Sequence, residues 1–258
     1  MRLMKRILSA AAVLALSASL LVGCSSGTAS SVPVSASSAA ESTVSSVEET
    51  ASSAVDENEA AAARLLNDLT GSYQELWPVI LADEYKQTWL DDCTALVGED
   101  NAEAAFEKLS SMVTGDVYGE DAVKAYANGG GAYFCGFTNS LAILTFDGET
   151  STISGTDKDG NVLFSHTYHY IGMEPVRGLY EFQSDDADSG EFTYFFLAPD
   201  TSAETYHIEF RYGSDAEALS QYDAGEYAYW VASGISTDCD QTMIDNCIEL
   251  FCTENLAG

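Results

Sequence analysis

The stretch that decides the fold is Phe192-Thr-Tyr-Phe-Phe-Leu-Ala-Pro199, followed after a short gap by Thr205-Tyr-His-Ile-Glu-Phe-Arg-Tyr-Gly213. Both runs are rich in aromatic and β-branched residues, and the segment 200–204 between them carries turn-forming residues. This combination predicts a β-hairpin. Because side chains alternate between the two faces of a strand, the second run has one polar face and one apolar face.

The polar face of the second run carries Thr205, His207, Glu209 and Arg211. The pattern fits two interpretations. In one, these residues are the solvent-facing side of a half-buried antiparallel strand. In the other, they lie at the mouth of a barrel, where His207 and Glu209 bind one metal ion across their i, i+2 spacing, because imidazole nitrogen and carboxylate oxygen are both zinc ligands.

Short β-prone runs separated by turns extend through the second half of the chain. Glycine supplies the positive φ in the turns at 146–149 and 157–161. Many short strands at close spacing predict an antiparallel barrel or sandwich. The expected strands are Tyr133–Phe137, Leu141–Phe146, Thr150–Thr156, Val162–Tyr170, Gly178–Gln183, Phe192–Leu197 and Tyr206–Tyr212.

The chain is helical in character before these strands and again at its end. Gly129-Gly-Gly131 indicates a hinge, since it follows a helix and precedes a strand, the reverse of a dinucleotide-binding loop. The helix over 101–112 is expected to begin with Asn101 as its N-cap. The expected helices cover 60–69, 83–96, 101–112, 118–126, 216–222 and 240–253, the last lying against the barrel wall.

The N-terminus has the pattern of a bacterial lipoprotein signal. Residues 1–6 include three basic residues, residues 7–21 form a mostly apolar run, and Leu21-Val-Gly-Cys24 is a lipobox. The apolar run is shorter than the ~20 residues that cross a bilayer. We therefore expect residues 1–23 to be removed and Cys24 to be lipidated. The protein would then sit on the extracytoplasmic face of the cell membrane, attached through this lipid alone.

A flexible tether is predicted from Cys24 to residue 57. This segment is rich in Ser, Ala, Thr and Glu and has no aromatic residue. Such a composition cannot bury enough apolar surface to fold. The folded domain is therefore expected to begin at residue 58.

The chain is strongly acidic, with a formal net charge of −31. Three of its ten Lys and Arg residues lie in the signal, so seven remain against 41 Asp and Glu. This surface repels nucleic acid and anionic lipid headgroups, and neither is an expected partner. It attracts divalent cations weakly and without selectivity.

Cysteine and histidine spacings give no complete metal motif. Five cysteines follow Cys24, and no pair has the C-x₂-C spacing of a structural zinc site. A disulfide is compatible with an extracytoplasmic location, but most of these cysteines are expected to be small buried hydrophobic side chains. His166 and His169 point to opposite faces of their expected strand, so they cannot chelate one metal ion together.

Enzyme signatures are absent from the sequence. There is no G-x-S-x-G nucleophile elbow and no H-E-x-x-H zinc motif. We expect the protein not to be an enzyme.

Several of these segments, taken in order, resemble the ZinT/YodA family of lipocalin-like zinc-binding proteins. The segment Leu69–Ile80 is similar to the family's opening segment, a Trp-containing helix ahead of the barrel. The resemblance spans about residues 58–258. The other matching segments are Tyr168–Gly172, Gly178–Phe182, Phe196–Pro199, the strand at 205–210, Gly213–Asp215 and Tyr222–Trp230.

The resemblance implies a mainly β fold with helices, of the α+β class. A helical part (58–128) would precede an antiparallel lipocalin-like (calycin) β-barrel with a C-terminal helix (131–258). The family's zinc site of three histidines falls here on Phe195, Thr205 and His207. Only His207 among these three can bind metal.

Two functions from different classes follow. The first is a surface-anchored lipoprotein that binds a divalent transition metal, zinc, for scavenging or for delivery to a metal ABC transporter. In it His207 is the central ligand, and Glu209, His169 or His166 replaces the missing histidines. The alternative is a lipocalin-like module that has lost zinc and binds a small apolar ligand or a partner protein.

Overall fold

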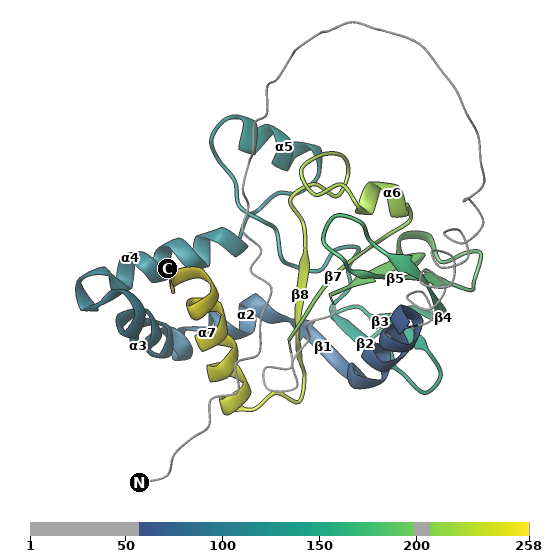
Figure 1. Ribbon diagram of the computed structural model, residues 1–258, viewed down its shortest axis with the longest axis horizontal. Helices are drawn as coiled ribbons and strands as arrows, with labels where there is room; N and C mark the ends of the chain where they lie inside the picture. Colours follow the sequence, from purple (N-terminus) through teal and green to yellow (C-terminus); the bar gives the residue numbers. More distant parts are fainter. Residues whose placement is uncertain (1–56, 199–206, 258) are drawn as a thin grey trace, which may run out of the picture. The chain divides into compact units, whose positions relative to one another are not determined.

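Eight antiparallel strands close into a barrel (Figure 1) in the part of the chain that the computed structural model describes, residues 57–198 and 207–257. Each strand pairs with its neighbour in sequence, and β1 pairs with β8 to close the barrel. The predicted α+β fold, with an antiparallel barrel and helices before and after it, is confirmed. The strands are Gly71–Glu75 (β1), Ile143–Asp147 (β2), Thr152–Thr156 (β3), Val162–Met173 (β4), Tyr180–Ser184 (β5), Tyr194–Leu197 (β6), His207–Gly213 (β7) and Ala232–Ser236 (β8).

Most helices lie before and between β1 and β2 or after β8. A helix over residues 57–68 precedes β1. Within the described residues, no helix is long and apolar enough to cross a membrane. The other helices are Leu76–Ile80 (α2), Asp83–Tyr85 (η1, 3-10), Lys86–Val97 (α3), Glu99–Val113 (α4), Glu120–Ala127 (α5), Gly190–Phe192 (η2, 3-10), Ala216–Leu219 (α6) and Gln241–Leu256 (α7).

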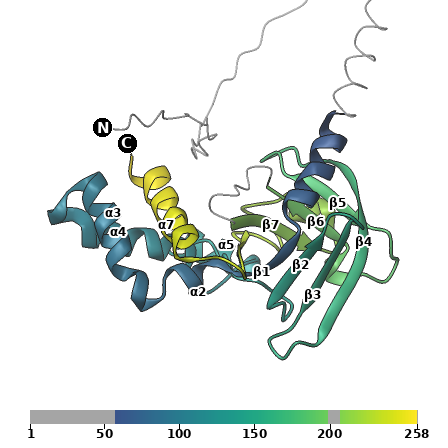
Figure 2. The ribbon, with the colours of Figure 1, turned by 90° about the horizontal axis from the view of Figure 1, so that it is seen from below.

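We call α2, α3, α4 and α7 the helical lobe, because they share one hydrophobic core beside the barrel (Figure 2). Apolar residues recur at helical spacing in α4 and α7, so each presents one stripe to this core. Asp240 caps α7, since its carboxylate accepts a hydrogen bond of 3.0 Å from the Met243 amide. Trp77, Trp89 and Phe251 meet at the centre of the lobe, with centroids 4.7 Å (Trp77–Phe251) and 6.0 Å (Trp89–Phe251) apart.

The segment Leu69–Ile80, expected to be a helix, contains strand β1 as well as the short helix α2. Tyr73 is buried in the barrel while the residues on either side of it are only half-buried, which is the alternation of a strand. Its ring contacts Phe146 of β2 edge-on at 5.7 Å. The barrel cannot close without a strand between β2 and β8, and this requirement overrides the helical spacing of the neighbouring apolar residues.

Three other local expectations were wrong. The segment Tyr133–Phe137 is not a strand: Phe134 makes only isolated bridges, to Thr114 and Trp230. Phe192 belongs to η2 rather than to β6. Asn101 lies inside α4, which begins after Gly98, whose φ of +84° ends α3 and lets the chain turn.

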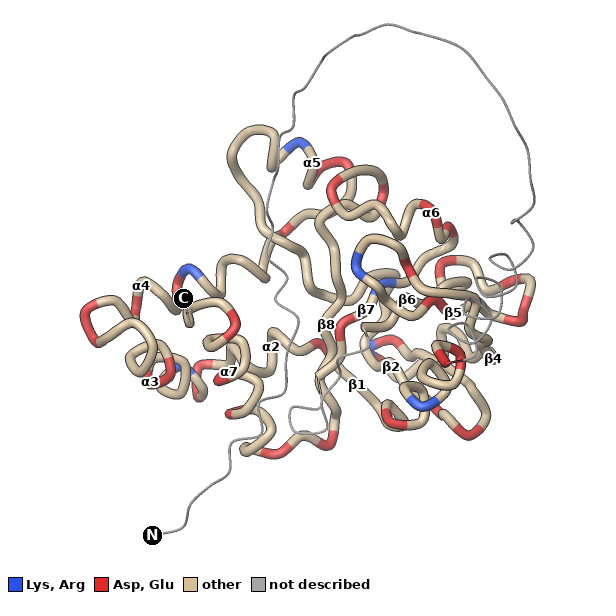
Figure 3. The backbone as a smooth tube through the Cα atoms, in the orientation of Figure 1, with Lys and Arg blue, Asp and Glu red and all other residues tan. Residues whose placement is uncertain are grey.

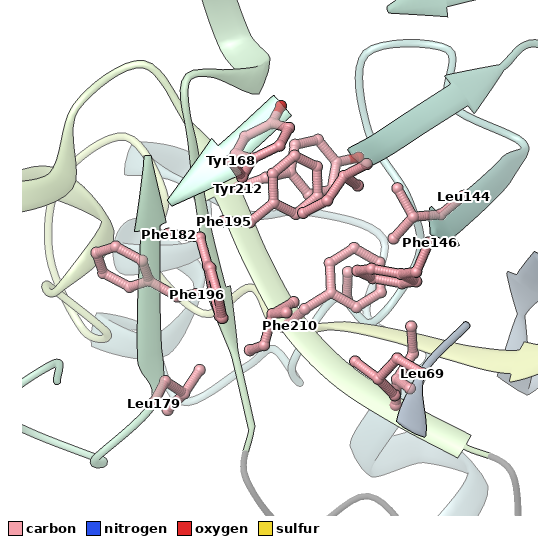
Figure 4. Close-up of a cluster of buried hydrophobic side chains, with 14 of the residues drawn as sticks. Leu69, Leu144, Phe146, Tyr168, Leu179, Phe182, Phe195, Phe196, Phe210 and Tyr212 are labelled. Atoms are coloured by element: carbon pink, nitrogen blue, oxygen red, sulfur yellow. The ribbon is translucent and has the colours of Figure 1, made fainter. Parts of the chain in front are cut away.

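The barrel interior is filled by aromatic side chains (Figure 4). The ring of Phe195 lies 5.4 Å from the rings of Tyr168 and Tyr212 and 6.4 Å from that of Phe210. These contacts join strands β4, β6 and β7 across the barrel, so the rings pack against each other in its centre. Burying each such ring contributes roughly 1.5–3 kcal/mol to folding. The interior is thus a packed core.

Residues 1–56, which include the predicted signal, Cys24 and almost all of the tether, lie outside the described residues. The segment 199–206, which includes Thr205 and the predicted turn, lies outside them as well. Four of the five described cysteines are buried and Cys239 is half-buried, as expected for small hydrophobic side chains.

Candidate metal site

Strand β7 presents His207, Glu209 and Arg211 on its outer face. Ile208, Phe210 and Tyr212 alternate with them and belong to the packed interior of the barrel. His207 is half-buried and Glu209 is exposed. These three polar side chains therefore lie on the outer wall of the barrel. The interpretation that placed them at the barrel mouth is wrong.

The neighbours of His207 and Glu209 on this wall come from β8. His207 is opposite Ile235, and Glu209 is opposite Ser233. Ile235 belongs to the core of the helical lobe, so the two candidate ligands lie where the lobe meets the barrel. They are two residues apart on one face of a paired strand, which holds both side chains on the same side of the sheet.

The thiol of Cys135 is a further candidate metal ligand, near Glu209. Its side chain is buried, and its backbone carbonyl accepts a hydrogen bond of 3.0 Å from the Ser233 amide. Burial and then the negative charge of Glu209 raise the pKa of the Cys135 thiol to about 12. Because a metal binds the thiolate, a thiol that stays protonated at neutral pH is a poor ligand.

His166 and His169 lie on β4, on opposite faces as predicted. The Nδ1 atom of His166 lies 2.7 Å from Oδ2 of Asp186, and that of His169 lies 2.7 Å from Oδ1 of Asp185. His166 is next to the buried rings of Phe164 and Tyr168 on the inner face, whereas the His169 side chain is 53% exposed. In each pair a carboxylate contacts one imidazole nitrogen and fixes the orientation of the ring. Histidines that bind a metal through their other nitrogen have the same arrangement.

The structure does not bring the four sequence-predicted ligands together. Strands β5 and β6 lie between β4 and β7 in the barrel, so His166 and His169 are remote from His207 and Glu209. In residues 57–198 and 207–257, no three His, Cys, Asp or Glu side chains form a group able to hold a metal ion. A stable tetrahedral zinc site has three or four protein ligands. The described side chains therefore do not fit a complete zinc site, and His207 with Glu209 is a two-ligand candidate.

Phe195, where the resemblance to the ZinT/YodA family implies a histidine, does not share a face with His207. Phe195 is opposite Tyr212 on β7, and both rings point into the barrel. His207 is an odd number of residues from Tyr212, so it points outward. Phe195 is therefore part of the barrel core.

The acidic residues are spread over both the helical lobe and the barrel loops (Figure 3). Cations are thus attracted to the whole surface and not to one point, and the attraction is screened within about 10 Å at moderate salt.

Two features of the candidate ligands and their neighbours were not predicted from the sequence. Asp185 and Asp186 follow β5, and their partnership with the β4 histidines depends on the β4–β5 register, in which Tyr168 is opposite Ser184. Arg211, which the pattern placed in a solvent-facing or metal-binding row, is 0% exposed. The sequence did contain a sign that Arg211 is buried, because a long segment rich in aromatic residues follows it and covers it.

No protein-family model matches the chain, and no curated protein does. Among solved structures, the chain is similar to the Zn(II)-bound ZinT-like domain of Streptococcus pneumoniae AdcA, with 15% identity and a TM-score of 0.45, covering 71% of this chain and 89% of that one. Zn(II)-bound AdcA from the same organism matches with 14% identity and a TM-score of 0.43, covering 72% of this chain and 35% of that one. The closed antiparallel barrel with its flanking helices is the arrangement that the resemblance to lipocalin-like (calycin) proteins implies.

Proposed function

We propose that this chain is an exported, lipid-anchored protein that binds a divalent transition metal ion, zinc, through His207 and Glu209. The observation that carries the proposal is the placement of both side chains on the outer face of β7, two residues apart. A paired strand is a rigid support, and a rigid support lowers the entropy lost when two side chains bind one ion. Water completes the coordination shell, and no catalytic role is assigned.

The role proposed for this site is weak, exchangeable capture of zinc outside the cell, for scavenging or for delivery to a metal ABC transporter. A shell with two protein ligands releases its ion more readily than a three-histidine shell, because each missing ligand leaves an exchangeable water. The acidic surface raises the local concentration of cations around such a site. Ready release suits a protein that passes its ion to an importer.

His207→Ala is expected to abolish stoichiometric zinc binding. The affinity of the unaltered chain should fall as the pH is lowered from 7 to about 5, since a protonated imidazole has no lone pair for the metal. Isothermal titration calorimetry with zinc measures both effects.

The matched control for His207→Ala is His169→Ala, which removes an exposed histidine from a strand remote from the site. It should leave the titration unchanged. Identical traces for the unaltered chain and His207→Ala would mean that any zinc is held by diffuse surface charge, and would reject the site.

The lipid anchor is proposed to be attached to Cys24. Cys24→Ala should abolish metabolic labelling with radioactive or alkyne-tagged palmitate, and should move the protein from the membrane fraction to the soluble fraction. Undiminished labelling of Cys24→Ala would show that the lipid is attached elsewhere or that the lipobox is not used.

A second candidate, a metal-free module that binds a partner protein, is favoured by the packed interior. Phe195 occupies a family ligand position and is fully buried, and the rings around it leave the barrel filled. A partner, if bound, would contact the outside, where Val162, Ile171, Met173 and Val176 are exposed. This candidate leads if the calorimetric titration detects no site.

A further inference from the structure

Two thiols from distant parts of the sequence meet in the core of the helical lobe. Cys93 lies on α3 and Cys252 lies on α7, 159 residues later in the chain. Their Sγ atoms are 3.9 Å apart, which is van der Waals contact, and both side chains are 0% exposed. We propose that Cys93 and Cys252 form a disulfide bond in the exported protein and so join the C-terminal helix to α3.

The position of α7 against α3 is fixed by large side chains next to the two thiols. Phe251, adjacent to Cys252, packs against Trp77 and Trp89. Trp89 is one helical turn before Cys93, and its Nε1 atom donates a 2.7 Å hydrogen bond to the Ile80 carbonyl. The two helices therefore hold the sulfurs face to face, and rotation about the Cα–Cβ bonds with a small approach of the helices closes the bond.

The proposed export of the protein places these thiols in an oxidising environment. Disulfides form and persist outside the cytoplasm. The inference thus rests on the export part of the proposed function, and it is independent of the zinc site. Three other cysteines are described. Cys135 is beside Glu209, Cys239 precedes α7, and Cys247 is buried on α7 in the same core, five residues before Cys252.

Burial determines when the bond can form. Removal from water raises the pKa of both thiols, and the thiolate is the species that attacks a disulfide. Once the lobe has folded with reduced thiols, it should therefore react slowly. The bond should form as α7 docks, while the thiols are still accessible.

The chemistry is thiol–disulfide exchange with a disulfide oxidant, RSSR. The thiolate of one cysteine attacks a sulfur of RSSR, forming a mixed disulfide and releasing RS⁻. The second thiolate attacks the protein sulfur of this mixed disulfide and releases the second RS⁻. The two cysteines lose two electrons and two protons, and RSSR is reduced to two RSH.

The test uses the full chain, unfolded in guanidinium and refolded with oxidised glutathione as RSSR. Remaining thiols are then alkylated under denaturing conditions and the digest is read by mass spectrometry. We expect a peptide containing Cys93 linked to one containing Cys252, with two fewer free thiols per chain. Alkylation of both cysteines, or a link from either one to a different cysteine, would overturn the proposal.

Melting of the refolded chain, before and after reduction by dithiothreitol, gives a readout that needs no variant. Reduction should lower the melting temperature by about 5–10 °C, because the bond closes a long loop in the unfolded chain. Cys93→Ser should remove this difference, whereas the control Cys239→Ser should keep it. An unchanged melting temperature on reduction of the unaltered chain would contradict a bond between α3 and α7.

Discussion

Phe195→His is expected to destabilise the domain by about 3 kcal/mol or more and to create no zinc site. The substitution places a histidine at a position where the resemblance to the ZinT/YodA family implies a zinc ligand. Phe195 is fully buried among Phe164, Tyr168, Phe210 and Tyr212, so the smaller imidazole leaves a cavity and a ring nitrogen without a hydrogen-bond partner. The free energy of unfolding in urea measures the loss.

The control for Phe195→His is Tyr194→His on the same strand. Tyr194 is half-buried, and its neighbour Phe195 points to the opposite face of β6. Tyr194→His should cost no more than about 1 kcal/mol. A Phe195→His variant that is as stable as the unaltered chain and binds zinc tenfold more tightly would show that position 195 faces His207 after all.

Arg211→Ala is expected to reduce the free energy of unfolding by about 3 kcal/mol and to expose segment 214–231 to hydrogen exchange. The Arg211 guanidinium donates hydrogen bonds to the carbonyls of Leu219, Gln221 and Tyr227, and it stacks on the Tyr222 ring, 4.3 Å from its centroid. Its removal leaves these carbonyls without their donor. Hydrogen exchange measured by mass spectrometry locates the effect along the chain.

Arg177 provides the comparison for Arg211, because it contacts the same Tyr222 ring, 4.0 Å from the centroid, but is only half-buried. Its guanidinium donates one hydrogen bond of 2.9 Å, to the Tyr133 hydroxyl. Arg177→Ala should cost about 1 kcal/mol and leave exchange in 214–231 slow. Equal protection of this segment in Arg211→Ala and the unaltered chain would mean that aromatic packing alone holds it.

The strands that the sequence predicted well are those with alternating apolar residues of high β-propensity. In β7 the alternation of Ile208, Phe210 and Tyr212 with polar residues gave both the strand and its buried face. Strands β1 and β8 were not predicted. Gly71–Glu75 and Ala232–Ser236 are poor in β-branched and aromatic residues, and they are strands because their neighbours need partners to close the barrel.

The candidate site was predictable only as far as local spacing reaches. The i, i+2 spacing put His207 and Glu209 on one face, and the i, i+3 spacing separated His166 from His169, and the structure agrees with both. The distance from β4 to β7 around the barrel depends on strand order, which no local pattern contains. The partners of the β4 histidines depend on a β4–β5 register that is interrupted by an irregularity between Tyr170 and Gly172.

The ligands around bound zinc test the central claim most directly. X-ray absorption at the zinc edge, on the full chain carrying one equivalent of zinc, reports the number of imidazoles and the presence of sulfur. We predict one imidazole per zinc, oxygen and nitrogen ligands at about 2.0–2.1 Å, and no sulfur at about 2.3 Å. Two or more imidazoles would show that His166 or His169 joins His207, sulfur would implicate a cysteine, and a spectrum unchanged in His207→Ala would contradict the site.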